Sequence, residues 1–161
     1  MNCANLTTST KLEDVIQSCL DGGRKKNALE FAAYLTENQM APRQYTGPDF
    51  WRVPYDSYYL CGIHLQKDSW RFWFFSGDYS GRHDKRFIKA VLDHVAGCSN
   101  CEEHCSKGRD MTIFGKEFTN ACFQFPIQFV NPGGGTLAYI KQLLEYRKTS
   151  APPGDSLHSY D

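Results

Sequence analysis

Apolar residues recur every three to four positions in four parts of the chain, which is the pattern of a helix that buries one face. The first part runs from Ser9 to Leu20, and the two glycines at 22–23 are expected to end it. The second runs from Lys25 to about Gln39. The third follows Asp84, a predicted N-cap, and continues to Gly97. The fourth extends from Thr136 to about Lys148, so the pattern predicts four helices.

Between the second and third helices, apolar residues occur at every second position, the period of a half-buried strand. This holds for Trp51–Tyr55 and Tyr59–Leu65, whereas Trp70–Phe75 is apolar on both faces apart from Arg71. Three successive runs of this kind predict an antiparallel three-strand meander over Trp51–Phe75. Pro54 has no N–H to donate, so it is expected near an edge of the sheet.

Two later segments add one or two further strands. Met111–Phe118 is expected to form a strand with a bulge at Gly115, and apolar residues alternate from Phe123 to Phe129. The fold class predicted is therefore α+β, with an antiparallel sheet packed against about four helices. At 161 residues the chain fits one domain over 1–150, and the polar, Pro-rich tail at 151–161 is expected to be disordered.

Charge and composition exclude some classes of partner. The 18 basic and 18 acidic side chains balance, so the global field gives no reason to expect nucleic acid or an anionic membrane surface as a partner. No apolar run approaches the roughly 20 residues that span a bilayer. The first residues lack the basic and apolar regions of a secretory signal, and seven is an odd number of cysteines. We therefore expect a cytoplasmic protein with reduced thiols, Cys19 being a small core residue.

The strongest chemical signal is a cysteine cluster between residues 98 and 122. Cys98 and Cys101 are separated by two residues, and Cys105 follows after three more. Thiolates two to four residues apart on a turn can converge on one zinc ion at about 2.3 Å. Cys122 follows the next β segment and is the first choice for a fourth ligand. His94, one turn before the predicted helix end, is the second choice, and His104, which is adjacent to Cys105, is the third.

Three interpretations of the cluster remain open at this stage. A structural zinc site suits tetrahedral cysteine ligands at this spacing, and four protein ligands leave no open position for catalysis. An iron–sulfur cluster also takes four thiolates, but the spacing differs from the C-x2-C-x2-C-x3-C-P run of ferredoxins. Free or oxidised thiols without a metal are the third, and an iron–sulfur or thiol redox protein is the alternative function. Zinc is the preferred cofactor, in a binding or interaction module.

A second candidate site lies on the aromatic strands. The aromatic residues suit a half-buried sheet. In an alternative interpretation, His64, Trp70 and Trp73 line a pocket for a small molecule, which would make the protein a ligand sensor or an enzyme. Cys61 and His64 are three residues apart on a strand and so point to opposite faces, which excludes a catalytic dyad. No catalytic constellation is recognised, so whether the chain is an enzyme stays open. A protein partner is the other possibility considered.

The stretches CSNCEEHC and TIFGKEFTNAC, with SWRFWF upstream, resemble a group of small bacterial proteins. These pair a C-x2-C-x3-C block and an IFGKEF-like stretch with a closing helix. The resemblance covers roughly Trp51–Lys148 and implies no activity, because none is assigned to the group. The order of helix, strand meander and helix is also similar to YjbR-like and YdhG-like α+β domains, in topology alone.

Overall fold

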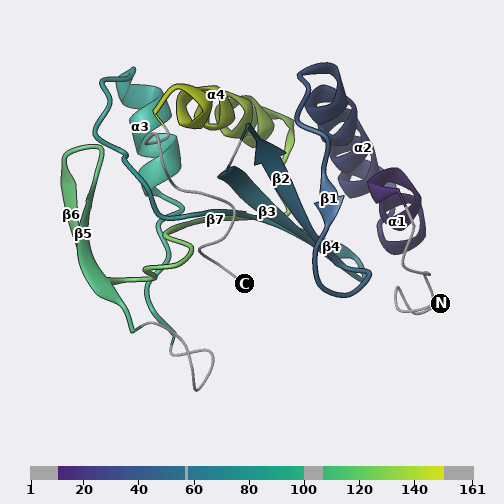
Figure 1. Ribbon diagram of the computed structural model, residues 1–161, viewed down its shortest axis with the longest axis horizontal. Coiled ribbons are helices and arrows are strands. Elements are labelled where there is room, and N and C mark those ends of the chain that lie inside the picture. Colours follow the sequence, from purple (N-terminus) through teal and green to yellow (C-terminus); the bar gives the residue numbers. More distant parts are fainter. Residues whose placement is uncertain (1–10, 57, 100–106, 151–161) are drawn as a thin grey trace.

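The computed structural model describes residues 11–56, 58–99 and 107–150, in which helices lie on one side of an antiparallel sheet (Figure 1). The described helices are α1 (Leu12–Cys19), α2 (Gly22–Glu37), α3 (Lys85–Leu92) and α4 (Gly134–Ser150). The described strands are β1 (Arg43–Gln44), β2 (Phe50–Tyr55), β3 (Tyr58–Gln66), β4 (Ser69–Phe74), β5 (Arg109–Ile113), β6 (Lys116–Ala121) and β7 (Ile127–Val130). The predicted α+β class is confirmed.

The main sheet has five strands in the order β1-β2-β3-β4-β7, and every pairing is antiparallel. The predicted meander is confirmed as β2, β3 and β4. A register shift between Val53 and Pro54 places both Leu60 and Cys61 in the core. The short β1 pairs only with Trp51 and Arg52, so Pro54 lies beyond that pairing, where its missing N–H breaks no ladder bond.

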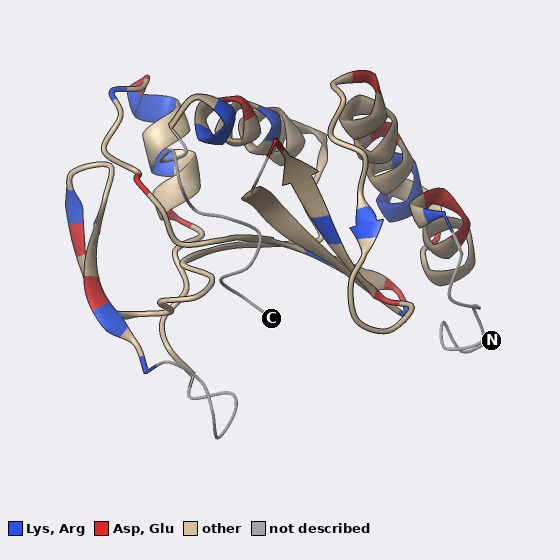
Figure 2. Cartoon of the chain, viewed as in Figure 1, with Lys and Arg blue, Asp and Glu red and all other residues tan. Residues whose placement is uncertain are grey.

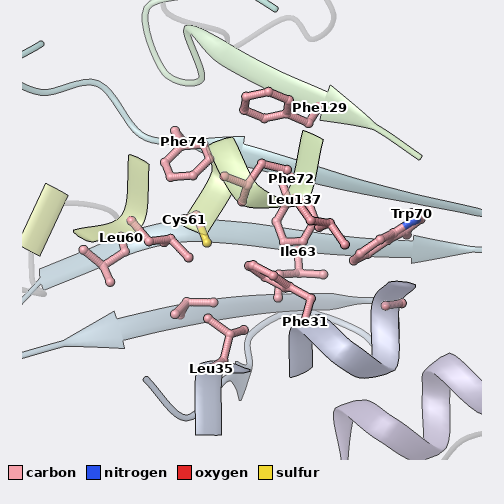
Figure 3. Close-up of a cluster of buried hydrophobic side chains, with 14 of the residues drawn as sticks. Phe31, Leu35, Leu60, Cys61, Ile63, Trp70, Phe72, Phe74, Phe129 and Leu137 are labelled. Atoms are coloured by element: carbon pink, nitrogen blue, oxygen red, sulfur yellow. The ribbon is translucent and has the colours of Figure 1, made fainter. Parts of the chain in front are cut away.

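Alternation along the strands gives this sheet two different faces. One face packs against α1, α2 and α4, and its side chains fill the core (Figure 3). There Phe31 of α2 meets Phe72 edge to face, with 4.5 Å between ring centroids. We call the other side the open face. Among β2, β3, β4 and β7, Lys, Arg, Asp and Glu are represented by Arg52 and Arg71 alone, and few coloured segments interrupt these strands in Figure 2. The strand register places both arginines on the open face.

The predicted helix boundaries need two corrections. The glycines at 22–23 begin α2 instead of ending α1, because the break falls at Leu20 and Asp21, whose backbone is extended. Asp84 is the N-cap of α3 as predicted, and its carboxylate accepts a hydrogen bond from the Arg86 N–H. However, α3 ends at Leu92, well short of Gly97.

The segment predicted as one bulged strand, Met111–Phe118, is a β-hairpin. Phe114 (φ 47°) and Gly115 (φ 78°) both have positive φ, as a two-residue type I′ turn requires. The turn is held by tertiary contacts: the Phe114 N–H donates to the Tyr79 carbonyl, and its ring packs edgewise on those of His83 and Phe87. The glycine marks the reversal of the chain.

The chain after α3 joins the hairpin to the main sheet. Val95 pairs with Ile127 of β7, and Gly97 pairs with Ala121 of β6, both antiparallel. The segment from His94 to Cys98 therefore lies between β7 and β6, and the hairpin projects beyond it (Figure 1). This pairing takes the place of the last turn of helix predicted there.

Two further findings concern the expected cellular environment of the protein, namely the membrane and the redox state of its cysteines. Among the described helices, none is both long and apolar enough to cross a bilayer. Cys19 is buried in the core as predicted, but its sulfur is in a disulfide bond. Since disulfides persist mainly in oxidising compartments, this bond departs from the expectation that every thiol is reduced.

Candidate functional site

The open face carries a cavity of about 420 Å³, bounded by the β1–β2 loop and by the chain that precedes β7. This volume falls in the range of roughly 300–1,000 Å³ that is usual for small-molecule sites. The residues lining it are Tyr45, Thr46, Asp49, Phe50, Arg52, His64, Trp73, Phe75, Gln124 and Phe125.

Trp73 is the centre of the aromatic wall. Its ring lies 5.3 Å from that of Phe50, 5.2 Å from that of Phe125 and 5.4 Å from that of His64, with tilts of 35–41°. The ring of Phe50 covers Gly62, where a Cβ would lie only 3.0 Å from the Phe50 Cζ. The absence of a side chain at Gly62 therefore lets Phe50 lean over the sheet beside Trp73.

An Asp–His pair lies on another side of the cavity. The carboxylate Oδ2 of Asp49 is 3.0 Å from the Nε2 of His64, and the two side chains are 42% and 17% exposed. His64 faces Phe50 across β2 and β3, so its position is fixed by the sheet register. Asp49 precedes the strand and reaches His64 from the loop.

Arg52 supplies a buried positive charge. Its side chain is only 6% exposed, and its guanidinium carbon lies 3.2 Å from the ring centre of Tyr45 and 4.7 Å from that of Tyr59. A guanidinium stacked on aromatic rings is stabilised by their electron-rich faces, which offsets part of the cost of removing it from water. The cavity wall thus combines aromatic surface with a fixed cation.

The structure brings two of the three predicted pocket residues together. His64 and Trp73 line the cavity, whereas the prediction that Trp70 joins them is wrong, because Trp70 is 1% exposed and packs on Phe31 in the core. On a strand, residues 70 and 73 point to opposite faces. Sequence reasoning missed Arg52 and Asp49, although the alternation of Trp51 and Val53 already places Arg52 on the opposite face.

Cys61 and His64 lie on opposite faces of the sheet, as predicted. Cys61 is a free thiol within the core, fully excluded from solvent. Burial raises the pKa of the Cys61 thiol well above its usual range, because a thiolate there would lose its hydration. It cannot act as a nucleophile in the native state.

Cys98 and Cys122 lie beside the bridge that joins the hairpin to the main sheet. The Cys98 N–H donates to the Asn120 carbonyl, and the Cys122 N–H donates to the Ala96 carbonyl, each over 2.8 Å. Both cysteines follow a member of the Gly97–Ala121 pair, so their side chains share the face opposite to that pair. In an antiparallel ladder these are diagonal neighbours about 7–8 Å apart.

The chain returns to Cys98 at Gly108. A side chain at Gly108 would collide with the Cys98 Cβ and with the Asn120 Oδ1, so only glycine fits this close approach. Cys101, Cys105 and His104, which lie between these two positions in the sequence, are outside the described residues. The two ends of that segment therefore meet beside Cys98.

The described residues do not form a complete metal site. Within residues 11–56, 58–99 and 107–150, no three His, Cys, Asp or Glu side chains are grouped so that they could hold an ion. His94, the second choice for a fourth ligand, does not join Cys98 and Cys122 in such a group. Its ring instead packs against that of Phe129, with 4.4 Å between centroids and a tilt of 39°.

Comparisons with known proteins add no assignment: no protein-family model, no curated protein and no solved structure matches the chain.

Proposed function

We propose that the protein is a binding module for a small molecule, which it holds in the cavity on the open face of the sheet. The observation that carries this proposal is the cavity itself, about 420 Å³ and walled by Phe50, Trp73 and Phe125. Aromatic side chains are usually buried in a protein core, but these three line a cavity at the surface. A planar ligand that stacks on these rings would remove this surface from water.

The polar groups around the cavity also support a specific ligand. Asp49 and Arg52 at the start of β2 and Gln124 in the chain before β7 come from two separate segments and converge on the same cavity. An apolar wall with a few placed polar groups is the usual composition of a ligand site, where the polar groups fix the ligand's orientation. A cavity that resulted only from imperfect packing would not have several polar side chains gathered around it.

The test is an NMR titration of the ¹⁵N-labelled protein with 2-naphthamide, an uncharged planar probe. The three tryptophans give three indole N–H signals, and we expect the signal of Trp73 to move on titration. Trp51 and Trp70 are 4% and 1% exposed on the core side, so their signals serve as internal controls. Phe125→Ala should weaken binding several-fold, since stacked aromatic pairs contribute about 0.5–1.5 kcal/mol beyond their buried area.

The matched control is Val130→Ala, which removes an exposed side chain that does not line the cavity. It should leave the affinity unchanged. No shift of the Trp73 indole at millimolar probe, or equal shifts of all three indoles, would refute the cavity as a binding site.

A second proposal concerns the cysteines: we propose that a structural zinc ion braces the hairpin against the main sheet, bound by Cys98, Cys101, Cys105 and Cys122. The pairing that places Cys98 and Cys122 on one face of the bridge supports it, because diagonal neighbours can direct both sulfurs at one ion. Cys101 and Cys105 enter through their sequence spacing alone. Such a site would stabilise the junction and perform no chemistry of its own.

Metal analysis of freshly purified protein tests this second proposal. We expect about one zinc per chain in the wild type, and loss of the metal in Cys98→Ser and Cys122→Ser. Cys61→Ala is the matched control, because Cys61 is a core thiol on the main sheet and should not affect metal content. Metal-free wild-type protein would exclude the site, and a brown protein with iron and broad visible absorbance would favour the iron–sulfur alternative.

A further inference from the structure

Asp49 contributes the most accessible charged group among the described residues that line the open-face cavity. Its side chain is 42% exposed, whereas Arg52 is 6% exposed and its guanidinium is stacked on Tyr45. An ionised carboxylate accepts hydrogen bonds and cannot donate them. A ligand that pairs with this group must therefore supply the donors.

His64 holds the Asp49 carboxylate in one orientation. The Nε2 of His64 lies 3.0 Å from the Asp49 Oδ2, and the register of β2 and β3 fixes the histidine opposite Phe50. Gly47 lies beside the other oxygen, where a Cβ would be 3.0 Å from Oδ1, so glycine at this position keeps a side chain off that oxygen. An acceptor that is ordered before binding loses less conformational entropy when a ligand arrives.

The Asp49 carboxylate keeps acceptor positions beyond the one that His64 uses. The two oxygens of a carboxylate offer about four lone-pair sites. Among the described residues, His64 is the one side chain that forms a hydrogen bond with this carboxylate. Two parallel N–H groups in one plane match the two oxygens of a carboxylate. An amino group beside a ring N–H presents such a pair of donors on a planar heterocycle.

The carboxylate also borders the aromatic wall of the cavity. Phe50 follows Asp49 directly in the chain, and its ring lies 5.3 Å from that of Trp73. The ring of Phe125 lies 5.2 Å from that of Trp73 as well. One flat ligand can therefore pack on these rings while its edge meets the carboxylate. The amide of Gln124, which also lines the cavity, offers a donor and an acceptor to the remaining polar atoms of the ligand.

We propose that the ligand of this cavity is a planar nitrogen heterocycle with two adjacent N–H groups. Its ring packs on the wall around Trp73, and the two N–H groups donate to the carboxylate of Asp49. His64 acts as a positioning residue, because it orients the carboxylate and leaves the other acceptor positions to the ligand. This inference rests on the proposed ligand-binding function and specifies its ligand class.

Three uncharged probes that share one bicyclic ring system test the proposal by isothermal titration calorimetry and by the Trp73 indole signal. These are 2-aminoquinazolin-4(3H)-one with two adjacent donors, quinazolin-4(3H)-one with one donor, and 3-methylquinazolin-4(3H)-one with none. We expect the affinity to fall about tenfold with each donor that is lost, because a hydrogen bond to a charged acceptor is stronger than one to a neutral acceptor. All three probes should shift the Trp73 signal.

Two substitutions in the cavity should have different effects on the probe series. Asp49→Asn replaces one acceptor oxygen by an NH₂ group, so it should abolish the preference for the two-donor probe over the one-donor probe. Phe125→Ala should weaken all three probes by a similar factor and keep their order. The matched control is Asp68→Asn, which removes an equal charge from the exposed turn between β3 and β4, outside the cavity. It should leave all three affinities unchanged.

The possible outcomes separate this inference from the function it rests on. Equal binding of the three quinazolinones, or a preference for two donors that persists in Asp49→Asn, overturns the heterocycle assignment. The ligand-binding function still stands in that case if 2-naphthamide shifts the Trp73 signal. If neither 2-naphthamide nor any quinazolinone shifts it, both fail. Should Asp49→Asn fold poorly, the probe series in the wild-type protein decides the question.

Discussion

Trp70→Ala is expected to lower the free energy of unfolding by about 3–5 kcal/mol, the usual cost of removing a large aromatic side chain from a core. Trp70 is 1% exposed, and its ring lies 4.9 Å from that of Phe72 and 6.3 Å from that of Phe31. It joins β4 to α2, so its removal leaves a cavity between the sheet and the helix. Urea denaturation followed by far-UV circular dichroism measures the loss.

Two variants serve as controls for this prediction. The Trp70 Nε1 is buried without a hydrogen-bond partner among the described residues, so Trp70→Phe removes an unsatisfied donor and should cost far less. Trp73→Ala, on the open face, should destabilise less than Trp70→Ala but abolish binding of 2-naphthamide. If Trp70→Ala abolished probe binding and left stability unchanged, our assignment of the two faces would be wrong.

Removal of the proposed zinc should have the second large effect. Apparent binding of a structural zinc is worth roughly 10–16 kcal/mol, comparable with the roughly 5–15 kcal/mol total stability of a domain. If only about 4 kcal/mol of this is coupled to folding of the whole chain, chelation lowers the midpoint of thermal unfolding by about 8–16 °C. Differential scanning calorimetry before and after chelation measures the shift, and added zinc should restore the original midpoint.

Hydrogen exchange would locate the same effect in the structure. The amides of Cys98 and Cys122 donate the two hydrogen bonds that join the hairpin segment to residues 94–98, so chelation should speed their exchange at least about tenfold. Amides between β3 and β4, which take no part in the bridge, should change much less. Exchange that accelerates equally in both places, or in neither, would contradict a local brace.

The side chains of the open face show which residues of the ligand site could be predicted from the sequence. The position of His64 and Trp73 on one face could be predicted because strand alternation is local: successive side chains of a strand point to opposite faces of the sheet. The same rule, applied to residues 70 and 73, would have placed Trp70 on the face opposite to Trp73. Asp49 could not be predicted, since it reaches His64 from a loop whose path depends on the pairing of β1 with β2.

For the cysteine region, the sequence suggested the candidate residues, but only the tertiary structure shows how they lie relative to each other. Spacing in the sequence nominated Cys98 and Cys122, but their relation depends on a two-residue bridge, Gly97 with Ala121, between segments more than 20 positions apart. The apolar pattern up to Val95 favoured helix, and the pairing of Val95 with Ile127 instead draws the chain into an extended path. Long-range pairing overrode a local preference there, as it commonly does for short segments.

By itself, the sequence determined the α+β class, the three-strand meander and most of the helices, because amphipathic period and turn residues act over a few neighbouring positions. Only the tertiary structure decided where the hairpin turns, since Phe114 needs its contacts with Tyr79 and Phe87 to hold a positive φ. The cavity is likewise a tertiary property. It exists because the register of β2, β3 and β4 brings Phe50, Arg52 and Trp73 onto one face.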